Sequence, residues 1–251
     1  MAQAAGEAPQ GGEVMTGLFV VLEGGDAVGK TTQSRYLDRW LSDAGVDHLI
    51  TREPGDTALG ARIRALLLDP ATGAISPKAE ALLYNADRAQ HLDEVVRPAL
   101  ERAEVVICDR YVDSTLAYQG AGRTLDAAEI AALADWATDG LTPDLTILLD
   151  ADPALTTAGI VDKDRLEAES LDFHRRVRDE FLRLAGRAPE RYLVLPARDR
   201  REEIAERIRA RLAPMIGIPA DPAGEDLDQA AMARQNGARA ELSGPDGTMT
   251  P

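Results

Sequence analysis

The fold is decided by the stretch Gly24-Gly25-Asp26-Ala27-Val28-Gly29-Lys30-Thr31, which directly follows the apolar run Leu18-Phe19-Val20-Val21-Leu22. It fits the pattern G-x-x-x-x-G-K-[ST], in which backbone N–H groups close around phosphate oxygens. In this pattern Lys30 reaches the outer phosphates and the Thr31 hydroxyl binds Mg²⁺. An amphipathic stretch over 32–41 follows the motif. The sequence therefore predicts a strand, a phosphate-binding loop for a nucleoside triphosphate, and a helix that begins near Lys30.

Strand-like apolar runs alternate with helical stretches along the chain. This alternation indicates a parallel sheet whose two faces are covered by helices. We therefore predict an α/β fold of the P-loop type, a three-layer sandwich with a five-stranded parallel sheet, helices on both faces and a small lid. Ligands of such sheets bind beyond the carboxyl ends of the strands. The expected strands cover residues 18–23, 46–51, 104–109, 144–150 and 191–196.

The two ends of the chain are expected to lie outside this domain. Residues 1–16 are rich in Ala, Gly and Gln, and residues 214–251 mix Gly, Pro, Ala and acidic residues with few large apolar ones. Such compositions bury too little apolar surface to offset the entropy of ordering. We therefore predict two disordered tails around a single domain at 17–213, with a lid at about 156–167.

The composition argues against several classes of partner. The formal net charge is −15 and the isoelectric point is near 4.6, whereas nucleic acids and anionic membranes bind basic surfaces. No apolar stretch approaches the ~20 residues of a membrane span, and residues 1–16 lack the parts of a secretory signal. We therefore expect a cytoplasmic protein without nucleic-acid or membrane partners. The single cysteine, Cys108, lies in an apolar run and is expected to be a buried, reduced thiol.

Charged residues follow the second and third strand-like runs. Arg52 stands in the rigid turn Thr51-Arg52-Glu53-Pro54-Gly55, where its guanidinium could bind a phosphate through two hydrogen bonds. Asp109 ends the third run in a position that suits an acid holding Mg²⁺, and Arg110 beside it would reach an acceptor phosphate. A surface ion pair beside the turn and a salt bridge at the strand end are the simpler alternatives.

Two pairs of side chains could hold the acceptor. Tyr84 and Arg88 are four residues apart on a long helical stretch over 79–100, so the ring and the guanidinium are adjacent. Such a pair can sandwich a base and grip its phosphate, although more often it is a core aromatic beside a solvated charge. Ser114 and Tyr118 also share one helical face.

A polar segment at 161–167 follows Gly159 and separates two helical stretches. This profile is typical of a mobile lid, which closes to exclude water that would hydrolyse the triphosphate. An ordinary loop with a helix-capping Asp is the alternative. The apolar stripe that follows predicts a core-facing helix with a structural His174. His48 and His91 carry no functional signal, and no His/Cys spacing indicates a metal site made by protein ligands alone.

Taken in order, these segments resemble the bacterial thymidylate kinases of the nucleoside-monophosphate kinase group. The resemblance runs from about Leu18 to Leu212. It is carried by the motifs Glu23-Gly24-Gly25-Asp26, Gly29-Lys30-Thr31-Thr32, Thr51-Arg52-Glu53-Pro54-Gly55, Ala86-Asp87-Arg88, Asp109-Arg110-Tyr111, Ala117-Tyr118-Gln119-Gly120, Pro143-Asp144-Leu145-Thr146 and Asp164-Arg165-Leu166-Glu167.

The resemblance implies an enzyme that transfers a phosphoryl group from ATP to dTMP in dTTP synthesis, works with Mg²⁺ and usually forms a homodimer. It implies that Lys30, Asp26 and Arg110 serve catalysis and that Tyr84 stacks on thymine. The implied ATP contacts are Gly24, Gly25, Asp26, Ala27, Val28, Gly29, Lys30, Thr31 and Thr32. The implied dTMP contacts are Arg52, Tyr84, Arg88, Arg110, Ser114, Tyr118 and Gln119, and the implied metal site comprises Thr31, Asp26 and Asp109.

The chain departs from the family pattern at the catalytic arginine. In the family this residue stands either in the loop, after the acid at the Asp26 position, or in the lid ahead of the Asp-Arg pair. Here the loop position is Ala27, and residues 156–163 contain no arginine. A missing arginine of this kind can cost ~10³-fold or more in rate. Either Lys163 or Arg165 supplies the charge, or catalysis is slow.

Two other functions remain open at this point. The chain could be a kinase of another nucleotide or nucleoside, or a nucleotide-binding regulator that keeps the fold and has lost catalysis. The absent arginine is the only feature of the sequence that favours the regulator.

Overall fold

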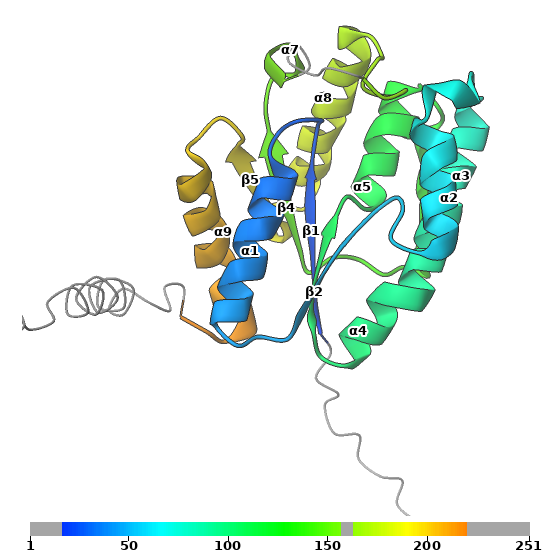
Figure 1. Ribbon diagram of the computed structural model, residues 1–251. Coiled ribbons are helices and arrows are strands. Elements are labelled where there is room, and N and C mark those ends of the chain that lie inside the picture. The colour runs from blue at the N-terminus through cyan, green and yellow to red at the C-terminus, as the bar shows by residue number, and fades with distance from the viewer. Residues whose placement is uncertain (1–16, 157–162, 220–251) are drawn as a thin grey trace, which may run out of the picture.

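The computed structural model describes residues 17–156 and 163–219, and its centre is a five-stranded parallel sheet (Figure 1). The strands lie in the order β2-β3-β1-β4-β5, with β1 in the middle. All five strands predicted from the sequence are confirmed, with bounds that shift by one or two residues. These bounds are Leu18–Gly24 for β1, His48–Arg52 for β2, Val105–Asp109 for β3, Leu145–Asp150 for β4 and Tyr192–Pro196 for β5.

Helices cover both faces of the sheet, as the predicted P-loop sandwich requires (Figure 1). Within the described ranges, none of them is long and apolar enough to cross a bilayer. The α-helices are α1 (Lys30–Asp43), α2 (Ala58–Leu68), α3 (Pro77–His91), α4 (Arg97–Glu101), α5 (Val112–Thr115), α6 (Ala127–Thr138), α7 (Pro153–Thr156), α8 (Leu171–Arg187) and α9 (Arg201–Ile216). The 3₁₀ turns are η1 (Pro70–Thr72) and η5 (Pro189–Arg191), and the π turns are η2 (Leu92–Val96) and η3 (Leu116–Gly122).

The central strand β1 is buried on both faces. Val20 belongs to a core cluster with Leu37 of α1 and Ile208 of α9, whereas Val21 belongs to a cluster with Leu92 of η2. Successive side chains of a strand point to opposite faces, so an unbroken apolar run is what a strand covered on both sides requires. This packing holds the start of the phosphate-binding loop in a rigid position.

The helical stretch predicted at 79–100 is divided into three segments. The π turn η2 separates α3 from α4 and begins directly after His91. Pro98 stands in the first turn of α4, where its missing N–H does no harm. Tyr84 and Arg88 both lie in α3, as the sequence predicted.

The C-terminal boundary predicted at residue 213 is too early. Helix α9 continues to Ile216, and Met215, Ile216 and Ile218 pack against the core that Leu212 lines. Because these apolar side chains pack against the core, a few residues that the composition placed in the disordered tail belong to the domain. The other tail residues, 1–16 and 220–251, and the lid residues 157–162 lie outside the described residues.

Candidate active site

A cavity of about 430 Å³ lies at the carboxyl ends of β1, β2 and β3. Its walls come from the loop after β1, the turn after β2, helices α2 and α3, and the segment after β3. This is the edge of the sheet at which ligands were expected. The predicted site residues that line the cavity are Asp26, Ala27, Val28, Gly29, Lys30, Thr31, Thr32, Arg52, Tyr84, Asp109, Arg110, Ser114, Tyr118 and Gln119.

The phosphate-binding loop turns sharply between β1 and α1. Gly29 precedes α1 with a φ of 97°, a left-handed conformation that favours glycine. No side chain caps α1 at this position, so the helix begins with N–H groups of the kind that bind phosphate. A Cβ on Gly24 would lie 2.4 Å from the carbonyl oxygen of Leu149, so only glycine fits there. The prediction that the helix begins near Lys30 is confirmed.

Lys30 folds back onto the loop that precedes it. Its Nζ donates hydrogen bonds to the carbonyl oxygens of Gly24 at 3.2 Å and Gly25 at 2.8 Å. Burial, together with the nearby Arg110, lowers the pKa of Lys30 to about 8. A phosphate on the loop would favour the charged lysine, so this environment suits an anionic ligand.

Asp26 and Arg110 form an ion pair between the loop and the end of β3. The Arg110 Nη2 lies 2.5 Å from Asp26 Oδ1, and the Tyr118 hydroxyl donates to Asp26 Oδ2 at 3.0 Å. Burial opposes ionisation of Asp26, but Arg110 and Lys30 outweigh burial and hold the pKa of Asp26 below its ordinary value. Arg110 also donates to the Gly24 carbonyl oxygen at 3.1 Å. The pair therefore connects the phosphate-binding loop to the end of β3 across the cavity.

Glu23 is a buried carboxyl group beneath this pair, and the sequence marked it only as part of a motif. It accepts hydrogen bonds from the Tyr111 N–H at 2.8 Å, the Ser114 N–H at 3.1 Å and the Ser114 hydroxyl at 2.7 Å. Burial and the charge of Asp113 raise the pKa of Glu23 to about 7. Glu23 thus holds the start of α5, and with it Ser114, against the end of β1.

Two of the three residues predicted to hold Mg²⁺ fit that role. Thr31 and Asp109 both line the cavity. Asp109 Oδ1 is buried and has no hydrogen-bond partner among the described residues, and carboxylate and hydroxyl oxygens are ligands that Mg²⁺ prefers. Asp26 is engaged by Arg110 and Tyr118. The donor set therefore fits a cation held mainly by Thr31 and Asp109.

Three guanidinium groups contribute positive charge to the cavity. Arg52, Arg64 and Arg110 all line it. The pKa of Arg64 is lowered by burial and by the charges of Arg52 and Arg110. The Arg64 Nη1 donates to the Pro54 carbonyl oxygen at 2.9 Å, and a Cβ on Gly55 would lie 2.7 Å from the Arg64 side chain. Arg64 carried no sequence signal, because it stands on an amphipathic helix outside every motif.

The remaining lining residues are both apolar and polar. Tyr84 of α3 lies beside the core cluster of Phe173 and Leu166, and burial raises the pKa of the Tyr84 phenol. The Gln119 amide donates to Glu80 at 2.8 Å, which fixes its orientation. Five further lining residues stand in motifs but were assigned no role from the sequence: Glu53, Pro54, Asp164, Leu166 and Glu167. The lining residues outside every motif are Arg64, Leu68 and Thr115.

Arg88, which was predicted to contact dTMP, lies in the interior of the protein behind the cavity. This side chain is not among those that line the cavity, and it is 1% exposed. Its Nε donates to Glu53 Oε2 at 2.7 Å, its Nη1 to Thr115 Oγ1 at 3.0 Å, and its Nη2 to the Tyr111 carbonyl oxygen at 2.9 Å. Because Glu53 and these acceptors hold the guanidinium inside the protein, Arg88 supports the acceptor wall from behind.

The two cationic side chains expected to act from the lid, Lys163 and Arg165, differ in their surroundings. Arg165 donates to the Leu67 carbonyl oxygen at 2.8 Å and forms an ion pair with the buried Glu80, which Arg123 shares. Lys163 is exposed. Neither side chain lines the cavity. Arg165 therefore anchors the polar segment to α2 and α3.

The fold and the site together define a class of protein. A parallel sheet with a glycine-rich loop between β1 and α1, and a cationic pocket beside that loop, is the arrangement of a P-loop phosphotransferase.

Comparison with known proteins narrows this class to one family. The family described as thymidylate kinase matches residues 22–208. The chain is 61% identical over 202 residues to a thymidylate kinase of Cutibacterium acnes, covering 80% of this chain and 99% of that one. It is 56% identical over 210 residues to one of Clavibacter michiganensis subsp. michiganensis, covering 82% and 99%. A crystal structure of thymidylate kinase from Ehrlichia chaffeensis matches with a TM-score of 0.66 and 33% identity, covering 78% of this chain and 98% of that one. The chain belongs to the thymidylate kinase family.

Proposed function

We propose that the chain transfers the terminal phosphoryl group of ATP to dTMP, giving dTDP and ADP, as a step of dTTP synthesis. The observation that carries this proposal is that one cavity joins a phosphate-binding loop to three arginines and a tyrosine ring. The 61% identity to a protein named thymidylate kinase supports dTMP as the acceptor.

In this proposal the ATP phosphates bind to the loop and to the N-terminus of α1. On binding, the outer phosphates replace the Gly24 and Gly25 carbonyl oxygens as partners of Lys30 Nζ. The positive charge of Lys30 then stabilises these phosphates. When bound by Thr31 and Asp109, Mg²⁺ supplies further positive charge to the phosphate oxygens. Phosphoryl transfer needs alignment and positive charge more than covalent help from the protein.

The dTMP phosphate binds between Arg52, Arg64 and Arg110 in this proposal. Arg110 is the member of the three that already touches the loop, through Asp26 and Gly24. It can therefore align the attacking phosphate with the triphosphate. The thymine ring stacks on Tyr84, with Ser114, Tyr118 and Gln119 as neighbours of the base and sugar.

Because the chain lacks the catalytic arginine of the family, another residue must supply its positive charge. We assign it first to Lys163, because the lid carries this residue and no contact with the described residues restrains it. Arg165 is the weaker candidate, since its guanidinium is bound to Glu80 and Leu67. Arg110 is the third candidate, because it already lies beside the loop.

We also propose that the protein acts as a homodimer in the cytoplasm, where ATP and dTMP are available. Helix α3 adjoins both α2 and α6, and each of the three helices exposes at least one large apolar side chain. These are Leu59 and Leu66 of α2, Leu82 of α3, and Trp136 of α6, which is 79% exposed. Such a patch suits an interface between copies. Sedimentation of the unaltered protein and of Leu82→Glu tests it, with a shift from dimer to monomer expected.

A coupled assay with dTMP, dUMP, CMP, AMP and GMP as acceptors tests the reaction. Turnover that strongly favours dTMP is expected. A preference for another acceptor would support a different nucleotide kinase. Binding of ATP and dTMP without turnover would support a regulator that has lost catalysis.

A further inference from the structure

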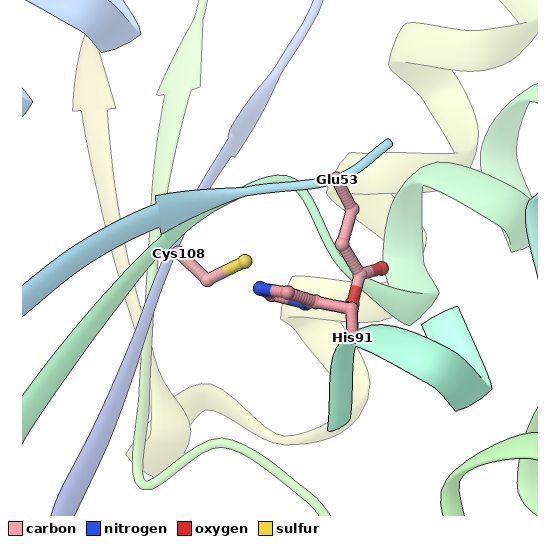
Figure 2. Close-up of side chains that lie close together, drawn as sticks. All are labelled: Glu53, His91 and Cys108. Atoms are coloured by element: carbon pink, nitrogen blue, oxygen red, sulfur yellow. The ribbon is translucent and has the colours of Figure 1, made fainter. Parts of the chain in front are cut away.

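A buried cluster of polar side chains lies directly behind the acceptor part of the cavity. Glu53, His91 and Cys108 point toward one another from the turn after β2, the end of α3 and β3 (Figure 2). A carboxylate oxygen, a ring nitrogen and the sulfur lie within 4.8 Å of one another, and all three residues are buried. Glu53 also lines the cavity, so this cluster can influence the acceptor site.

The three residues are ligand types that zinc accepts, but the charges around them favour a proton over a metal ion. Arg88 Nε lies 2.7 Å from Glu53 Oε2, so a divalent cation would face a guanidinium. The Cys108 thiol donates to the Arg110 carbonyl oxygen at 3.1 Å, and burial raises the pKa of Cys108 well above its ordinary value. Zinc requires the thiolate, which this environment disfavours.

The hydrogen-bond partners of His91 determine which of its ring nitrogens carry a proton. The Thr51 hydroxyl donates its only proton to Asp56 Oδ2 at 2.5 Å, so it can only accept from His91 Nε2, which lies 2.6 Å away. Glu53 Oε1 lies 3.0 Å from His91 Nδ1. Because Glu53 is paired with a guanidinium, its carboxylate is ionised and can only accept. Both ring nitrogens of His91 must therefore donate, which makes the ring an imidazolium.

The charged groups that face His91 are consistent with a positive ring. The acids are Glu53 and Asp56, with Asp87 near enough that burial and the Glu53 charge raise the pKa of Asp87 to about 6. Arg88 is the guanidinium that pairs with Glu53, and Cys108 remains a neutral thiol. Of these acids Glu53 and Asp87 are buried and Asp56 is exposed. An imidazolium thus adds a second cation, beside Arg88, to two buried acids, and buried charges are tolerated only when paired.

We propose that His91 is a positioning residue, held as an imidazolium, that fixes Glu53 and thereby shapes the acceptor site. His91 does not line the cavity, so it acts through the residues that it bonds. Glu53 forms part of the cavity wall and holds Arg88, and Arg88 donates to Thr115, another lining residue. His91 therefore supports two residues of the cavity wall, Glu53 directly and Thr115 through Glu53 and Arg88. The effect on dTMP rests on the proposed function, whereas the charge of His91 does not.

The protonation state of the His91 ring is tested by a long-range proton–nitrogen NMR spectrum of the unaltered protein near neutral pH. The chain contains only 3 histidines, so the variants His48→Gln and His174→Gln assign the His91 signals by elimination even if His91 variants fail to fold. We expect both ring nitrogens of His91 to show protonated shifts. A neutral tautomer, with one protonated nitrogen, would overturn the proposal.

The positioning role is tested by kinetics of His91→Gln, with His48→Gln as the matched control. Loss of one charge-assisted hydrogen bond should raise KM for dTMP about 10-fold. KM for ATP and kcat should stay within about twofold, because the phosphate-binding loop is not touched. An unchanged KM for dTMP, or equal increases in both KM values, would refute this role. If the unaltered protein does not turn over dTMP, the proposed function fails while the NMR result still decides the charge of His91.

Discussion

The Arg110 guanidinium lies 2.5 Å from the Asp26 carboxylate, and this contact joins the end of β3 to the phosphate-binding loop. Arg110 adopts a φ of 71°, a backbone conformation that is uncommon outside glycine and often found at functional sites. Tyr118 donates to the second oxygen of Asp26 and lies under the guanidinium, which is 5.1 Å from the ring centre. The Arg110 guanidinium is therefore held next to the phosphate-binding loop by protein contacts alone, an arrangement that suits catalysis by alignment.

Lys30→Ala should lower kcat by ~10²-fold or more, because it removes a cation that acts on the transferred phosphate. Folding should be preserved or slightly improved, since burial already disfavours the charged lysine. Turnover and thermal unfolding by circular dichroism measure the two effects. Lys78→Ala is the control, because Lys78 is largely exposed. Normal turnover in Lys30→Ala would contradict the assignment of the loop.

Arg64→Ala should weaken dTMP binding by ~1.5–3 kcal/mol, the scale of a hydrogen bond to a charged group. ATP binding should change little, because Arg64 lies on the acceptor side with Arg52. Isothermal titration with each nucleotide measures both affinities. Arg62→Ala provides a matched control, since Arg62 is exposed on the same helix. Equal losses in the two variants would mean that Arg64 does not contact the acceptor.

Tyr84→Ala should weaken dTMP binding by ~1–3 kcal/mol, the contribution of one base stacked on an aromatic ring. Tyr36→Ala, on α1 and bonded to Glu202, serves as the control. Competition binding with dTMP and ATP separates the two sites. An ATP loss as large as the dTMP loss would place the acceptor base elsewhere.

Glu23→Gln should flatten the dependence of folding stability on pH. Because folding raises the pKa of Glu23 from 4.5 to about 7, its contribution is fully present below pH 4.5 and is lost as pH rises through about 7. The unaltered protein should therefore lose up to ~3 kcal/mol more than the variant between mildly acidic and mildly alkaline pH. Urea unfolding at both pH values measures this difference. Parallel losses would show that Glu23 titrates as in the unfolded chain.

Lys163→Ala and Arg165→Ala should behave differently. If Lys163 supplies charge only in the transition state, its removal lowers kcat and leaves nucleotide affinities unchanged, and Ala27→Arg partly restores the rate. Arg165→Ala should instead lower the free energy of unfolding by ~1–3 kcal/mol, because Glu80 loses a buried partner. Single-turnover kinetics and urea unfolding separate the two. An unchanged kcat in both Lys163→Ala and Arg165→Ala would move the role to Arg110.

Most of the fold and the donor half of the site were evident from the sequence. The loop at Gly24 to Thr31 is a local motif whose backbone requirements are met by consecutive residues, so spacing alone predicts its conformation. The strands are also local, because each is a short apolar run, and the central strands β1, β3 and β4 are buried on both faces. The aromatic Tyr84 and the cations Arg52 and Arg110 were likewise identified, since each stands in or near a motif.

Only the tertiary structure decided which charges face the cavity and which face the interior. Arg88 stands in a motif but pairs with the buried Glu53, whereas Arg64 stands in none and lines the cavity. Arg165 forms an ion pair with Glu80, which is distant in the sequence. A buried charge must find a partner wherever the fold brings one, and that partner is set by packing between segments far apart in the chain. Local sequence therefore determined the strands and the loop, while long-range pairing determined the direction of each guanidinium.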